Sequence, residues 1–89
     1  MKVIIDGNII SHRLQLHDFL ASELNFPETY GKNLDALYDC LTDIHYETEI
    51  EIINYNVLYD NLGNYAKVLS KMLMQASKEN KFIKFSSDM

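Results

Sequence analysis

Three short runs rich in β-branched residues, separated by longer segments of helical character, constrain the fold of this chain more than any other feature. The runs are KVIID (residues 2–6), TEIEII (48–53) and KFIKFS (81–86). Val, Ile and Thr favour strands, and strands joined through helices pair in parallel by right-handed crossovers. The sequence therefore predicts an α/β fold, a small three-stranded parallel sheet with about four helices, in a single domain of residues 1–89.

The segments between the strands carry apolar residues at intervals of three and four, a spacing typical of helices with one buried face. The predicted helices cover residues near 12–25, 34–44, 57–62 and 65–79. Ser11, Asn33 and Asn64 stand before three of these segments, and such side chains cap helix N-termini. Helices normally cover one face of so small a sheet, so we expect at least one helix to keep its outer side in solvent.

Composition places the chain among soluble globular proteins. Hydrophobic residues make up 47% of it, which argues against disorder, and no apolar run approaches the roughly 18 residues that span a membrane. The opening MKVIIDG lacks the apolar stretch of a secretory signal, and the lone Cys40 cannot form an internal disulfide. We expect a cytoplasmic protein that is monomeric when free and does not bind a membrane.

The charges are unevenly distributed along the chain, whose net charge is −5. Between residues 28 and 51, seven acidic residues accompany Lys32 alone, giving −6. Between residues 67 and 84, five lysines accompany Glu79 alone, giving +4. A net negative domain is poorly suited to nucleic acid and better suited to a basic partner. The two segments could also neutralise each other within the fold.

Asp35, Asp39 and Asp43 fall at intervals of four in the second predicted helix. Like charges at this spacing weaken a helix by roughly 0.2–0.5 kcal/mol per pair, and Asp39 and Asp43 also approach the negative end of the helix dipole. At 100° per residue their centre lies roughly 170° from the apolar stripe, so the acids should point straight outward. The pattern suits an ordinary solvated face or a surface that binds a cationic partner.

The segment FPETYGKNLDALYDCL, residues 26–41, resembles the signature of the barstar family, intracellular inhibitors of barnase-type guanyl-preferring ribonucleases. The residues that fit the family pattern are Pro27, Glu28, Tyr30, Gly31, Asn33, Leu34, Asp35, Ala36, Leu37, Asp39, Cys40, Leu41 and Thr42. The resemblance is weaker in the rest of the chain. There it rests on the KVIIDG opening, the LHDFL segment and the order of helices and strands. The family fold, a three-stranded parallel sheet with helices, agrees with the fold predicted above.

The resemblance implies that the second helix and the turn before it plug the active-site cleft of a secreted basic ribonuclease in a one-to-one complex. Cationic side chains must line a cleft that holds RNA phosphates, and a carboxylate on a rigid helix can take a phosphate position at little entropic cost. Asp39 would be this phosphate mimic, and Asp35 would pair with a further basic group. Asn33 and Thr42 would form hydrogen bonds at the rim, while Asn33 equally suits an ordinary N-cap.

Four positions of the surface implied by the resemblance depart from the family pattern. Thr29 and Tyr38 stand where the family commonly has Tyr and Trp. Tyr38 can still supply an aromatic surface, or it can be a half-buried helix residue, whereas Thr29 cannot stack. Asp43 replaces a glycine, and Gln75 falls near the place of a family glutamate. The gain of Asp43 and the loss of the later acid shift negative charge along the surface, as adaptation to a different basic cleft would require. Random substitution after loss of the partner would give a similar pattern.

Other functional classes find less support in the sequence. Asp35 and Asp39 could bind Mg²⁺ through two carboxylates, but no glycine-rich phosphate loop accompanies them. The three histidines show no zinc-binding spacing with Cys40. We therefore predict no enzymatic activity, no metal and no cofactor. A non-inhibitory binding or regulatory module for another basic protein is the alternative, because it would need the same acidic surface.

Overall fold

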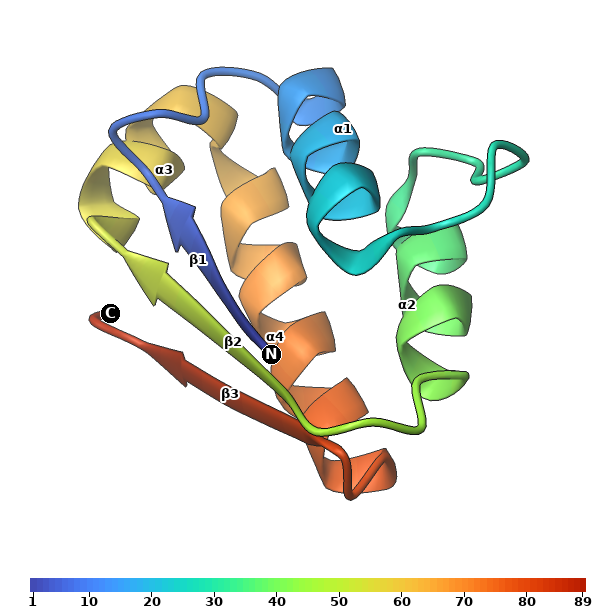
Figure 1. Cartoon of the computed structure of the whole chain (residues 1–89). Helices are drawn as coiled ribbons and strands as arrows, with labels where there is room; N and C mark the ends of the chain where they lie inside the picture. Colours follow the sequence, from blue (N-terminus) through green and yellow to red (C-terminus); the bar gives the residue numbers. More distant parts are fainter.

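In the computed structural model, which describes residues 1–89, a three-stranded parallel sheet forms one layer of the fold (Figure 1). Its strands are β1 (Lys2–Asp6), β2 (Thr48–Ile53) and β3 (Ile83–Ser87), in the order β1-β2-β3. Both neighbouring pairs are parallel. Helices form every crossover, as parallel pairing requires. The predicted α/β class and parallel sheet are confirmed.

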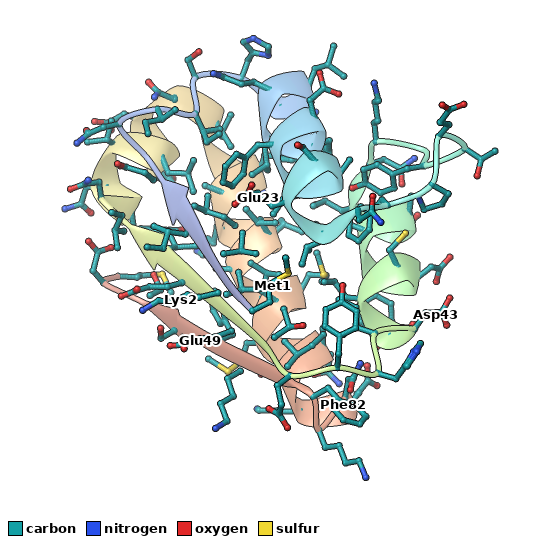
Figure 2. All side chains as sticks on the ribbon, in the orientation of Figure 1. Met1, Lys2, Glu23, Asp43, Glu49 and Phe82 are labelled. Atoms are coloured by element: carbon teal, nitrogen blue, oxygen red, sulfur yellow. The ribbon has the colours of Figure 1, made fainter.

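The two faces of the sheet differ because side chains alternate along each strand. Four fully buried side chains of the inner face join the core: Val3, Ile5, Ile50 and Ile52. The outer face carries a charged row in which Lys2 lies opposite Glu49, and Glu49 opposite Lys84. Lys2 Nζ lies 3.9 Å from a Glu49 oxygen and 3.3 Å from a Glu51 oxygen, and Figure 2 shows Lys2 beside Glu49. Helices therefore cover only one face.

Four helices complete the fold: α1 (Arg13–Leu24), α2 (Leu34–Thr42), α3 (Tyr55–Leu62) and α4 (Asn64–Glu79). α4 packs against β3, α2 and α3, and Figure 1 shows α2 at the side of the molecule away from the sheet. The apolar faces of the helices and the inner face of the sheet form one cluster of 20 buried hydrophobic residues. No helix combines the length and the hydropathy needed to cross a membrane.

Several predicted boundaries and caps are wrong in detail. His12 rather than Ser11 caps α1, because the His12 side chain accepts a hydrogen bond from the Gln15 amide. Asn64 is the first residue of α4 and forms no side-chain capping bond. α2 ends two residues earlier than predicted. The last strand begins at Ile83, because the two preceding residues form a turn.

The C-terminal residues tie the end of β3 to the junction between β2 and α3. The Asp88 amide donates to the Ile52 carbonyl at 3.1 Å, and the Asp88 carboxylate accepts from the Asn54 and Tyr55 amides at 2.7 and 3.0 Å. A negative charge is favoured at the start of a helix. Gly7 lies against the same junction, where a Cβ atom would meet the Asn54 carbonyl oxygen at 2.1 Å. Only glycine fits there.

Candidate protein-binding site

The turn that precedes α2 fixes the start of this helix. Asn33 Oδ1 accepts a hydrogen bond from the Ala36 amide at 2.8 Å, and Asn33 Nδ2 donates to the Gly31 carbonyl at 3.3 Å. Lys32 Nζ lies 2.9 Å from Asp18 Oδ1, which joins the turn to α1. The structure therefore confirms Asn33 as the N-cap residue. A further role of Asn33 towards a partner stays a prediction.

The end of α2 is held from α4. Asn80 is buried, and its Nδ2 donates to the carbonyls of Leu41 and Ile44 at 2.9 and 2.8 Å. The Leu41 carbonyl also accepts from the Ile44 amide at 3.2 Å, so Asn80 gives it a second bond and supplies the donor for the Ile44 carbonyl beyond the helix end. Leu37 and Leu41 are fully buried on the inner side of α2. Both ends of α2 are thus attached to neighbouring elements.

Asp35 and Asp39 lie on the outer side of α2 and Asp43 is its C-cap residue; we call these three residues the acidic face. All three residues are exposed, and Figure 2 shows Asp43 projecting from the outer side of the helix. None of them takes part in an ion pair, because the ion pairs of the chain use other carboxylates. Burial, with the charges of Asp43 and Asp39, raises the pKa of the Cys40 thiol. The carboxylates of the acidic face therefore form no ion pair, although Arg13 and Lys32 line a pocket beside Asp35.

A buried chain of hydrogen bonds, which we call the His17 network, lies beneath the turn. His17 is fully buried, with Nδ1 2.6 Å from the Tyr30 hydroxyl and Nε2 2.6 Å from the Tyr65 hydroxyl. A neutral imidazole donates through one ring nitrogen and accepts at the other, so the ring satisfies both contacts. Burial lowers the pKa of His17 and raises the pKa values of Tyr30 and Tyr65. The network fastens the turn to α1 and α4.

The other predicted residues of α2 and the turn lie beside the acidic face. Tyr38 is half-buried and packs against the core. Thr42 is exposed, and its hydroxyl donates to the Asp39 carbonyl at 2.9 Å, which leaves the hydroxyl oxygen able to accept a further bond. Thr29 is exposed in the turn, next to the buried Tyr30. One helix and the turn before it thus carry all of the predicted partner-binding residues except Gln75.

Gln75 belongs to α4 rather than to α2. It is exposed and lines a groove together with Lys71 and Lys78. α4 packs against α2, so a partner on the acidic face could still reach part of α4. Contact between Gln75 and such a partner stays a prediction.

A flank of α4 that the sequence analysis did not consider lies closer to the acidic face. Tyr65 lines a shallow pocket of about 300 Å³ with Asp35 and with two cationic residues, Arg13 and Lys32. Met72 and Glu79 follow Tyr65 at intervals of seven residues, and residues seven apart lie on the same side of a helix. Glu79 is exposed at the last position of α4, one residue before Asn80, which bonds to the end of α2.

No group of three or more His, Cys, Asp or Glu side chains is placed to hold a metal ion. A helix that is anchored at both ends and carries unpaired carboxylates on its outer side presents an ordered acidic surface. Comparison with known proteins defines the class more closely. The family model described as "Barstar (barnase inhibitor)" matches residues 1–87, so the chain belongs to the barstar family.

A curated relative points to the same class. The chain is 38% identical over 81 residues to the Bacillus subtilis (strain 168) protein named "Putative ribonuclease inhibitor YrdF". The match covers 90% of this chain and 89% of the relative. This protein therefore belongs to a family of ribonuclease inhibitors and is not an enzyme.

Proposed function

We propose that the acidic face and the turn before it occupy the active-site cleft of a basic, secreted ribonuclease in a one-to-one complex. The free inhibitor is a monomer and acts in the cytoplasm of the cell that makes the enzyme. One observation carries this proposal: the three carboxylates of the acidic face are exposed and form no ion pair, and the helix that presents them is held at both ends. Because the helix is ordered before it binds, placing these carboxylates against cations costs little entropy.

The position of each residue supports its proposed role. Asp39 lies at the middle of the acidic face and is the phosphate mimic, since its carboxylate can accept charge-assisted hydrogen bonds from several cationic groups. Asp35 pairs with a second cation near the turn. Tyr38 and Thr42 flank Asp39 and contribute an aromatic surface and a hydroxyl. Asn33 contacts the enzyme at the rim.

The departures from the family pattern define the partner further. Thr29 offers no ring for stacking, so the cognate ribonuclease needs no aromatic or guanidinium plane opposite the turn. Asp43 adds a carboxylate at the end of α2, which favours an enzyme with an additional cation there. Gln75 supplies hydrogen bonds in place of a charge. We therefore propose a barnase-like enzyme whose cleft differs from that of barnase.

Titration of guanyl-preferring extracellular ribonucleases with the protein tests this function. We expect RNA cleavage to fall linearly to zero at one inhibitor per enzyme and to recover when the complex is dissociated. The matched control is the Asp35→Asn, Asp39→Asn double variant, which keeps the size of both side chains and should not inhibit. Undiminished cleavage across the panel, with binding to some other basic protein, would favour the non-inhibitory module instead.

A further inference from the structure

The side of α4 next to β3 bears a groove of about 340 Å³, which is separate from the acidic face. Its apolar floor consists of Met74, Phe85 and Met89. Met74 is 44% exposed and Met89 is 70% exposed, although both are large apolar side chains. Methionine side chains adapt their shape to different partners. Exposed apolar surface of this kind often marks a binding site for another molecule.

Three lysines of α4 line the same groove: Lys67, Lys71 and Lys78. None of them forms an ion pair, and no ion pair joins residues 67–84 to the acidic segment 28–51. The two segments meet in the sheet, where Lys84 lies opposite Glu49, but no carboxylate pairs with the lysines of the groove. Uncompensated positive charge beside an apolar floor is complementary to an occupant that carries both carboxylates and apolar side chains.

The groove adjoins the free edge of β3, which is the last strand in the sheet order. The Phe82 carbonyl and the Asp88 amide bond to β2, so the even-numbered residues of β3 face β2. Alternation along a parallel pair then directs the amides and carbonyls of Phe85 and Ser87 to the opposite side. Figure 1 shows no element beyond β3 on that side. Such an edge can pair with an added strand.

We propose that an extended acidic segment of a partner protein docks here by adding a strand to the edge of β3. Its backbone bonds to Phe85 and Ser87, while its inward side chains cover the apolar floor and reach Lys71 and Lys78. Lys84 of β3 is exposed on the outer face of the sheet, so outward carboxylates of the added strand meet a positive charge as well. A nucleic acid has no peptide backbone to pair with the free amides and carbonyls of the β3 edge, which favours a polypeptide as the occupant.

An NMR titration of the free protein with a short peptide that alternates glutamate and valine tests this site without a ribonuclease. We expect the amide signals of Phe85 and Ser87 to shift and their exchange with solvent to slow. Lys71→Glu should weaken peptide binding by about tenfold, since it replaces an attraction by a repulsion. Lys81→Glu is the matched control: it makes the same change of charge outside the groove and should alter binding by less than about twofold.

A second peptide tests strand addition without changing the protein. Methylation of the peptide nitrogens that face β3 removes their hydrogen-bond donors, and we expect it to abolish binding. Equal binding of the methylated peptide would overturn the strand-addition proposal. The proposal is also overturned if a peptide that alternates lysine and valine binds equally well, or if a short RNA binds the groove more tightly than the acidic peptide.

Discussion

The two charged surfaces of this molecule are built in different ways. Polar anchors hold the acidic face of α2 in place: the exposed cap residue Asn33 at one end, the buried Asn80 at the other and the His17 network beneath the turn. The basic groove on α4 has exposed methionines on its floor and an unpaired strand edge beside it. A surface ordered in advance loses little entropy on binding, whereas an adaptable one can repack around varied segments. The acidic face therefore suits one rigid cleft, and the groove suits an extended segment.

The largest effect that we predict separates the three carboxylates of the acidic face. Asp39→Ala should weaken binding to the cognate ribonuclease by about 2–5 kcal/mol, because truncation leaves cations of the cleft buried and unpaired. Asp35→Ala should cost less, and Asp43→Ala least. The aspartate at the Asp39 position of the barstar motif is already a known hot spot, so the order of the three losses is the prediction. Calorimetric titration of each variant measures it.

Unfolding of the same variants in the absence of ribonuclease serves as the control. Removing an outward carboxylate relieves repulsion along α2, so the free energy of unfolding should stay level or rise by about 0.2–0.5 kcal/mol. Our assignment of roles is wrong if Asp39→Ala unfolds the protein, or if Asp43→Ala weakens binding most.

Asn80→Ala should show that the acidic face depends on its anchors. The substitution leaves the Ile44 carbonyl without a donor and removes one of the two bonds to the Leu41 carbonyl, which should lower the free energy of unfolding by about 1–3 kcal/mol. Inhibition should weaken as well, because the end of α2 is released. Asn64→Ala is the matched control on the same helix, since Asn64 is exposed and makes no capping bond. Equal stability of the two variants, measured by urea unfolding, would contradict the role of Asn80.

Ionic strength should change the rate of association with the ribonuclease far more than the rate of dissociation. The segment of residues 28–51 carries a net charge of −6, so we expect it to steer the encounter with a basic enzyme. Raising salt from low to physiological strength should slow association by about tenfold and change dissociation little. Stopped-flow kinetics measure both rates. An association rate that is independent of salt would show that the acidic face does not guide the encounter.

The smallest effect that we predict concerns pH. Burial lowers the pKa of His17 in the folded protein, so the unfolded chain binds a proton at higher pH than the folded one. Stability should therefore fall as pH drops below roughly 6.5, the unfolded value, and level off below the folded pKa. Unfolding of wild type and His17→Leu over this range measures the effect. A loss of the same size in both proteins would exclude His17 as its source.

The local patterns of the sequence predicted the sheet and the direction of the acids correctly. β-Branched runs and turns mark strands wherever they stand, and the helical period alone places Asp35, Asp39 and Asp43 opposite the buried Leu37. Gln75 shows the limit of such reasoning. The family pattern places a partner-binding residue near Gln75 but does not say on which side of α4 the side chain lies. In the structure Gln75 lines the groove next to β3.

The anchors beneath the acidic face were not predictable because they join distant parts of the chain. Asn80 bonds to carbonyls 39 and 36 residues earlier, and His17 meets Tyr65 at a separation of 48 residues. Nothing in the residues around Asn80 marks it as buried. His17 did carry a signal, since it directly follows Leu16 and precedes Leu20 by three positions in an apolar stripe. A histidine on such a stripe must find hydrogen-bond partners within the core.

The central claim is that Asp39 takes the place of an RNA phosphate in the cleft of a ribonuclease. Competition between the protein and a guanosine monophosphate for the cognate enzyme tests it most directly. We predict strict competition, in which the apparent dissociation constant of the inhibitor rises in proportion to the nucleotide concentration. Simultaneous binding of inhibitor and nucleotide, each with unchanged affinity, would show that α2 does not occupy the phosphate site.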